Sequence, residues 1–182
     1  MMLTTLIEGL AEDLTQELPA EGLDHAVSAV VETCEVQLGW TFSQIVGPPP
    51  SRTQSPCRGS TIALTSAGGT WLLIALCDRD SCHSLTRALF AMEADEDVGI
   101  EDAADALNEV MNVAAGVFKS HRDARGEKLE IGLPTYLDGE ETACRLSDGV
   151  ARRSRMISTH DGVRMRLIAF WKGGAGRDDL HA

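Results

Sequence analysis

The chain of 182 residues is 43% apolar and 24% charged, which is enough to bury one proper core and argues for a single main domain. Its 28 acidic residues outnumber its 16 basic ones, and the formal net charge of -12 would repel a phosphate backbone over most of the surface. No nucleic-acid partner is therefore expected, and the short basic cluster Arg152, Arg153 and Arg155 is interpreted as a solvated strand or loop face.

Two helices are predicted at the start of the chain. Leucine and isoleucine recur at helical spacing from residue 3 to residue 14, which predicts an amphipathic helical extension over residues 1–22. This extension either packs on the core or mediates self-association. A second helix is predicted from Asp24, as the N-cap, to Gly39, as the C-cap, with Glu32 and Glu35 facing outward. The residues expected to face inward are Ala26, Val27, Val30, Val31, Cys34 and Leu38.

Shorter elements follow, and each is predicted from its apolar pattern and its turn residues. They are a strand (41–46), a loop with four prolines (47–59), a β-hairpin (60–65 and 71–76), a helix (81–92) and an acidic turn (93–99). The side chains expected on the inner face of this helix are Leu85, Ala88, Leu89 and Met92.

The longest predicted helix spans residues 102–121 and carries an unusual polar stripe. Asp105, Glu109, Asn112 and Gly116 lie opposite its apolar face, and the side chains of Glu109 and Asn112, three residues apart, can address one partner together. Gly116 costs roughly 1 kcal/mol relative to alanine in a helix interior. It either admits another part of this protein or clears space for an incoming protein surface. The predicted core face is Ala103, Ala106, Leu107, Val110, Val113, Ala114, Val117 and Phe118.

The remainder of the chain is predicted to be mainly β-structure. A strand at residues 129–133 is ended by Pro134, and three more strands are expected at 143–146, 155–159 and 163–170. The last two are joined by a His-Asp-Gly turn. The main domain would thus cover residues 23–172, followed by a disordered, glycine-rich tail at 173–182.

The order of the predicted elements suggests a weak internal repeat. Each half runs from a helix through strands to a hairpin, and the second arm of each hairpin carries an Ile-Ala pair near its end. This pattern predicts an α+β (mixed α/β) fold in which two pseudo-repeated halves form one mixed β-sheet, with two long helices packed on one face.

The sequence predicts a cytoplasmic protein without a metal site. Residues 1–14 carry three acidic residues where a secretory signal has a basic start, and the longest apolar run, 71–77, is far short of the ~20 residues of a membrane span. The five cysteines, Cys34, Cys57, Cys77, Cys82 and Cys144, lack disulfide spacing and are expected to be reduced thiols. Cys77, Cys82 and His83 have ligand-like spacing but no second pair.

Glu109, Asn112 and Gly116 give the pattern E-x-x-N-x-x-x-G, which resembles the signature helix of the CheC/CheX/FliY family of chemotaxis phosphatases. The segments I-G-L-P at residues 131–134 and G-T-W-L-L-I at residues 69–74 are similar to the strand that follows this helix and to the hairpin that precedes it. The resemblance covers about residues 24–170, and it is clearest from residue 103 to residue 134.

The resemblance implies hydrolysis of the aspartyl phosphate on a CheY-like receiver domain of a response regulator. Asn112 would orient the attacking water and Glu109 would pair with a basic residue of the partner, so these two are the candidate catalytic residues. Asp105 and Gly116 are the candidate partner-binding residues. An amide suits this task because it does not repel phosphoryl oxygens. No cofactor is expected in the chain itself, and Mg²⁺ is expected on the partner receiver.

One catalytic site per chain is expected, because Glu32 and Glu35 on the second helix come without an asparagine. A single site resembles the CheX branch, whose members tend to form homodimers. The alternative function is a non-catalytic CheX-like adaptor that binds a receiver or another signalling domain. A small-molecule sensor is a third reading, but the chain has no recognisable phosphate loop, nucleophile pair or cofactor motif.

Overall fold

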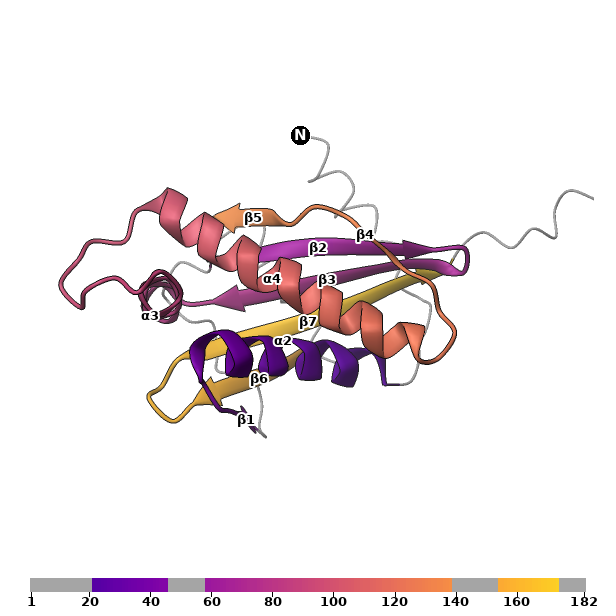
Figure 1. Ribbon diagram of the computed structural model, residues 1–182, viewed down its shortest axis with the longest axis horizontal. Helices are drawn as coiled ribbons and strands as arrows, with labels where there is room; N and C mark the ends of the chain where they lie inside the picture. Colours follow the sequence, from indigo (N-terminus) through magenta and orange to yellow (C-terminus); the bar gives the residue numbers. More distant parts are fainter. Residues whose placement is uncertain (1–20, 46–57, 139–153, 174–182) are drawn as a thin grey trace, which may run out of the picture.

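The computed structural model describes residues 21–45, 58–138 and 154–173 (Figure 1). The predicted N-terminal helix, most of the proline-rich loop, the strand at 143–146 and the tail lie outside these described residues, as do Cys57, Cys144, Arg152 and Arg153. Among the helices that are described, none has the length and apolar character needed to cross a membrane.

Within the described residues, seven strands form one sheet, and every pairing between them is antiparallel. They are β1 (Phe42–Ile45), β2 (Arg58–Ser66), β3 (Gly69–Cys77), β4 (Glu130–Ile131), β5 (Thr135–Asp138), β6 (Ser154–Thr159) and β7 (Arg164–Gly173). The α+β fold class is confirmed, but the sheet is antiparallel instead of mixed. Tight hairpins join β2 to β3 and β6 to β7, and a tight hairpin requires antiparallel arms.

The strand order of the sheet is symmetric with respect to the two predicted halves. Its order is β1-β6-β7-β3-β2-β4, and β5 also pairs with β2. At one edge, β1 of the first half pairs with the β6–β7 hairpin of the second half. At the other edge, β4 and β5 of the second half pair with the β2–β3 hairpin of the first half. The hairpins meet through β3 and β7 at the centre, where Ile74 lies opposite Ile168. These isoleucines belong to the two Ile-Ala pairs of the sequence.

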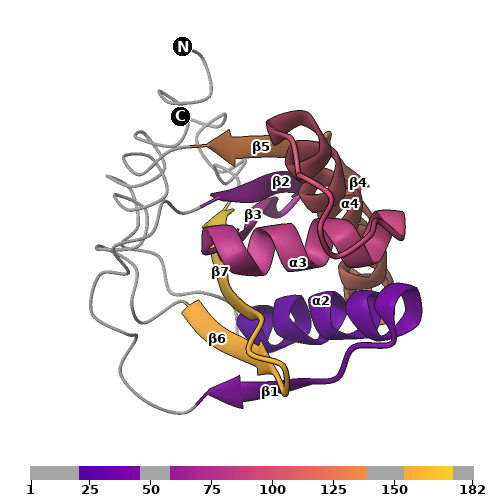
Figure 2. The same ribbon diagram turned by 90° about the vertical axis from the view of Figure 1, so that its left-hand side faces the viewer.

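Three helices, α2 (Gly22–Leu38), α3 (Arg79–Phe90) and α4 (Ile100–Asp123), cover one face of the sheet (Figure 2). The two long ones, α2 and α4, pack side by side, as predicted. The main core fills the space between helices and sheet, with Trp71 and Phe118 fully buried at its centre. A second apolar cluster lies on the other face and consists of Leu72, Ile74, Leu76, Leu137, Ile168 and Phe170.

The boundaries and the inner face of α2 differ slightly from the prediction. The helix begins two residues before Asp24, so Asp24 lies in its first turn, whereas Gly39 ends the helix in the left-handed conformation, as predicted. Thr33 is buried although it is polar, because its hydroxyl donates a hydrogen bond to the Ala29 carbonyl at 2.7 Å. The inner face of α2 is therefore rotated toward Ala29 and Thr33. Val27, Val31 and Leu38, which are predicted to face inward, are only half-buried.

Three further differences from the prediction concern α3, β5 and β4. On α3, Ala88 is exposed, and Thr86 is buried in its place with its hydroxyl donating to the Cys82 carbonyl at 2.9 Å. The strand β5 was not expected, because four residues with no apolar alternation carry little local signal. It exists because β2 supplies its hydrogen-bonding partners, with Thr61 opposite Thr135. The predicted strand at 129–133 is reduced to the two residues of β4.

Replacing Gly22 by alanine is expected to lower the free energy of unfolding by about 1–3 kcal/mol. A Cβ at this position would lie 2.3 Å from Cη2 of Trp71, a fully buried ring packed against Phe118 and Trp171. Urea denaturation measures the effect, and Gly68→Ala is the control because a Cβ there meets no atom closer than 3.7 Å. Equal stabilities of the two variants would contradict this account of the packing.

Candidate functional site

The long helix α4 is fixed on the sheet by one apolar face. Val113 and Val117, predicted to be in the core, are half-buried, whereas Met111 and Ala115 are fully buried in their place. The core face is thus rotated by a fraction of a turn from the prediction, which leaves the opposite face of the helix turned toward solvent. The buried residues are Ala103, Ala106, Leu107, Val110, Met111, Ala114, Ala115 and Phe118.

Polar contacts hold both ends and the middle of α4. The carboxylate of Asp102 accepts a hydrogen bond from the backbone N–H of the N-cap residue at 3.0 Å, and Arg122 forms an ion pair with Glu127 at 2.6 Å. In the middle, Ser60 of β2 donates a hydrogen bond to Oδ1 of Asn108 at 2.7 Å. The sequence analysis missed this last contact, because its partners are 48 residues apart and no local pattern links them.

The exposed face of α4 carries the three polar residues that the sequence singled out. Asp105, Glu109 and Asn112 are all exposed, and no hydrogen bond or ion pair engages their side chains within the described parts of the chain. Asp105 and Glu109 are four residues apart with like charges, which repel each other on a helix surface. A cation from a partner would relieve this repulsion, so the stripe fits a surface that presents a basic residue.

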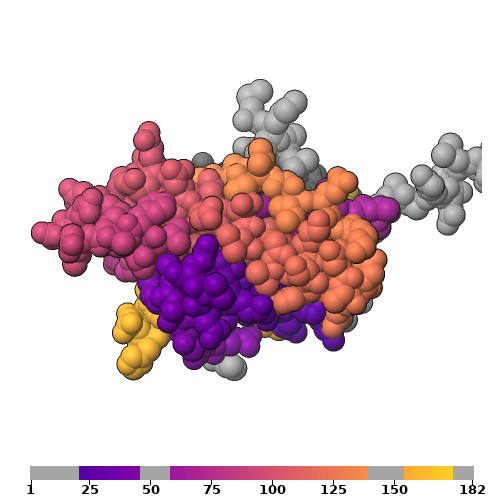
Figure 3. Space-filling view, viewed as in Figure 1, coloured from indigo at the N-terminus to yellow at the C-terminus, as the bar shows by residue number. Residues whose placement is uncertain are grey.

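Gly116 completes the stripe and has open space above it. A Cβ added there would have no neighbouring atom within 4 Å in the described structure. Among the described residues, no other part of this protein packs against Gly116. Clearance for an incoming surface stays a prediction that the open space makes sterically reasonable. Figure 3 shows α2 and α4, with α3 beside them, on one face of the molecule.

Replacing Gly116 by alanine is expected to raise the free energy of unfolding by about 0.5–1 kcal/mol, because alanine is the better helix former and nothing obstructs its methyl group. Urea denaturation of the full chain measures the change. A loss of stability would mean that the glycine serves the fold, which would weaken its assignment to a partner-binding surface.

The helix α2 repeats the pattern of α4 with one chemical difference. When α2 is aligned with α4 so that Glu32 matches Glu109, Glu35 matches Asn112, and the buried residues Ala26, Ala29, Val30, Thr33 and Cys34 of α2 match buried residues of α4. Glu32 is also engaged within the protein, because Ser28 donates to its carboxylate at 3.0 Å and His121 lies 3.4 Å away. At these two matching positions of the described helices, therefore, α4 presents an amide beside a carboxylate with no partner among the described residues, whereas α2 presents two carboxylates, one of them engaged.

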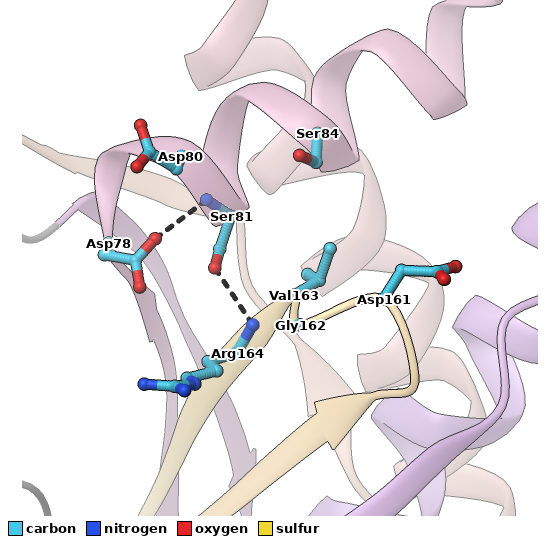
Figure 4. Close-up of a pocket in the computed structure, with 8 residues that line it drawn as sticks. All are labelled: Asp78, Asp80, Ser81, Ser84, Asp161, Gly162, Val163 and Arg164. Atoms are coloured by element: carbon cyan, nitrogen blue, oxygen red, sulfur yellow. Dashed lines mark hydrogen bonds between the residues drawn. The ribbon is translucent and has the colours of Figure 1, made fainter.

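A cavity of about 220 Å³ lies elsewhere, between the start of α3 and the β6–β7 turn (Figure 4). Ser81 accepts a hydrogen bond from the backbone N–H of Arg164 at 2.9 Å, and its own backbone N–H donates to Asp78 at 2.8 Å. None of the lining residues belongs to α4. The stripe on α4 therefore does not line this cavity. The lining residues are Asp78, Asp80, Ser81, Ser84, Asp161, Gly162, Val163 and Arg164.

The described residues do not supply the elements of a metal centre. Within the described ranges, no three His, Cys, Asp or Glu side chains are grouped so that they could hold an ion. His83, which the sequence placed beside Cys82, instead contacts the Arg58 guanidinium through Nε2 at 3.1 Å. The exposed stripe contains no thiol, hydroxyl or imidazole that could attack a substrate directly. Its two carboxylates and one amide can bind a partner, pair with a cation, accept a proton or orient a water molecule.

Comparison with solved structures finds the same fold in several bacterial chemotaxis proteins. CheX from Vibrio vulnificus is similar with a TM-score of 0.66 at 12% identity, covering 86% of this chain and 100% of the other. CheX from Desulfovibrio desulfuricans has a TM-score of 0.63 at 13% identity, covering 84% and 99%. A CheX–CheY–BeF3–Mg²⁺ complex from Borrelia burgdorferi gives 0.62 at 18% identity, covering 82% and 96%.

Comparison with curated protein sequences finds no match. A family model, by contrast, matches residues 59–154, which is more than half of the chain, and it describes the chemotaxis phosphatase CheX. The matched region runs from β2 through the whole of α4 and its exposed stripe to the start of β6. The match and the shared fold agree with the resemblance carried by Glu109, Asn112 and Gly116. The chain therefore belongs to the CheX family of chemotaxis phosphatases.

Proposed function

We propose that the chain accelerates hydrolysis of the aspartyl phosphate on a CheY-like receiver domain. The observation that carries this proposal is the pair Glu109 and Asn112, which is exposed, has no internal partner among the described residues and adjoins the open space over Gly116. The Borrelia burgdorferi relative has been solved in complex with CheY, and that complex supports a receiver domain as the partner.

Asn112 is proposed to hold the attacking water in line with the scissile P–O bond. An aspartyl phosphate is already reactive, and the receiver brings its own Mg²⁺, so positioning a water molecule is the task that is left. The neutral amide can accept a hydrogen bond from the water through its oxygen and donate one through its nitrogen. A carboxylate in this place would repel the phosphoryl oxygens. This difference explains why Glu35 at the matching position of α2 is not proposed as a catalyst.

Glu109 is proposed to anchor the receiver by pairing with a lysine or arginine near the phosphorylation site. Its carboxylate has no partner in the described structure, and Asp105 one turn away adds a second negative charge. A charge pair that becomes desolvated in the complex fixes orientation as well as affinity. Glu109 would therefore set the position from which Asn112 reaches the phosphoryl group.

The decisive measurement is the decay of a ³²P-labelled receiver domain from the same genome, with Mg²⁺, in the presence and absence of the full chain. Faster decay that is lost in the Asn112→Ala variant is the expected result. Unchanged decay of every receiver tested, despite measurable binding to one of them, would overturn the phosphatase and favour the non-catalytic adaptor. The oligomeric state, expected to be a homodimer, can be measured on the same sample by sedimentation.

A further inference from the structure

The face of the sheet opposite the helices carries apolar side chains that the proposed function does not use. Along β3 and β7, successive side chains alternate between the two faces, and every second one packs under the helices. The helices α2, α3 and α4 all lie on that helix-covered face (Figure 2). The side chains that point the other way form what we call the outer cluster. Its members are Leu72, Ile74, Leu76, Leu137, Ile168 and Phe170.

The outer cluster is buried, although none of the described helices lies on its side of the sheet. The exposed fractions of its members run from 1% for Ile74 and Ile168 to 6% for Leu72 and Leu137. Side chains on an open sheet face keep more of their surface in water, because neighbouring strands cover only their flanks, and an apolar face requires a second layer. Burial within a single chain favours a cover from the same chain over a second copy.

Residues 1–20 are the part of the chain outside the described ranges whose sequence fits this face best. They contain six leucine or isoleucine residues, whereas the parts 46–57, 139–153 and 174–182 contain at most two leucine, isoleucine or valine residues each. Five of the six recur at helical spacing, which puts them on one face of a helix. These five are Leu3, Leu6, Ile7, Leu10 and Leu14.

Charge gives a second, independent reason for this choice. Residues 1–20 contain four acidic residues and no lysine or arginine, whereas each of the other three parts contains at least one arginine. Arg166 and Lys172 lie on the same side of β7 as Ile168 and Phe170, one toward each end of the outer cluster. An acidic amphipathic segment therefore complements this face better than a segment that brings its own arginines.

The length of the segment and the point where it joins the fold also match. It leads into α2 at Gly22, which packs against the ring of Trp71, the neighbour of Leu72 along β3. A helix over residues 3–14 would be ~18 Å long, and the outer cluster extends for ~14 Å along and across the strands. Residues 15–21 can span up to ~25 Å, which exceeds the ~10 Å between packed layers.

We propose that residues 3–14 form an amphipathic helix that docks on the outer cluster as a third layer of the fold. Its leucines and isoleucine face Leu72, Ile74, Ile168 and Phe170, and its acidic residues lie toward solvent and toward the cations of β7. This contact closes the outer face to a second copy of the chain. The proposal does not depend on the phosphatase activity, because the stripe on α4 belongs to the opposite layer.

Hydroxyl-radical footprinting of the full chain, read by mass spectrometry, tests this contact through the exposure of Phe170. Leu10→Glu places a charge in the apolar face of the proposed helix and should raise the oxidation of Phe170 several-fold. Thr5→Glu adds the same charge about half a turn away and should leave Phe170 as protected as in the wild type. Phe118, fully buried in the main core, should stay protected in both variants and shows that they are folded. Equal protection of Phe170 in Leu10→Glu and the wild type would overturn the proposal.

Two further measurements keep the result decisive. If Phe118 is also oxidised in Leu10→Glu, that variant has unfolded, and Leu10→Ser repeats the test without a buried charge. Sedimentation of the same samples over a dilution series separates the two sources of cover. Protection of Phe170 that persists in the wild-type monomer supports the docked helix. Protection that is lost as a dimer dissociates would assign the outer face to a second copy and overturn the proposal.

Discussion

The Asn112→Ala variant is expected to lose the acceleration of receiver dephosphorylation, with a fall in rate on the order of 100-fold or more. The amide is the only group that we place next to the attacking water, and a methyl group cannot orient that water. Binding of the receiver should change little, because Asn112 is not assigned to the charge pair. The measurement is the single-turnover decay rate of the phosphorylated receiver at saturating concentrations of the chain.

Two control variants make this result specific. Asn112→Asp keeps the size of the side chain but adds a charge, and it should be as inactive as alanine because a carboxylate repels the phosphoryl oxygens. Glu35→Ala changes the matching position of α2 and should retain full activity. Because Asn112 is exposed, all three variants should keep their stability within about 0.5 kcal/mol. Activity that survives in Asn112→Ala would show that the mechanism is wrong.

The Glu109→Ala variant is expected to weaken receiver binding by about 2 kcal/mol, or roughly 30-fold in Kd. The side chain is exposed and has no partner among the described residues, so its removal should change the stability of the fold little. The complex, however, would lose a charge pair. Isothermal titration calorimetry with a receiver held in its BeF3–Mg²⁺ form measures the change without turnover. The decay rate at saturating concentrations should fall much less than in Asn112→Ala.

Salt and a second acidic residue test the electrostatic part of this prediction. The wild-type Kd should rise with ionic strength, and this dependence should be weaker in Glu109→Ala because one ion pair is missing. Glu101→Ala removes the same charge from the first turn of α4, outside the stripe, and should bind almost as tightly as the wild type. Equal losses in the two variants would indicate a general effect of net charge instead of a specific pair.

Several features of the fold were predictable because they depend on local sequence. The 3.6-residue period located α4, and the apolar arms on either side of Ala67 and Gly68 located the β2–β3 hairpin. Gly39 ended α2 as expected, because glycine adopts the left-handed conformation without strain. The stripe of Asp105, Glu109, Asn112 and Gly116 was predictable for the same reason, since a helix fixes which side chains share a face.

Other features depend on contacts between residues far apart in the chain. The antiparallel order of the sheet, the short strand β5 and the hydrogen bond from Ser60 to Asn108 were absent from the expectations, because their partners come from other elements. Small polar residues such as Thr33 and Thr86 entered the core by satisfying their hydroxyls on the preceding turn. A scale of residue hydrophobicity cannot reveal this.

The sequence by itself determined the helices, the hairpins and the identity of Glu109 and Asn112 as neighbours on one helix, because 3.6-residue and two-residue periods are properties of the local backbone. Only the tertiary structure decided that this pair faces solvent without a partner among the described residues, and that Gly116 has open space above it. Exposure and pairing depend on what the rest of the chain brings to each surface, and packing alone sets that.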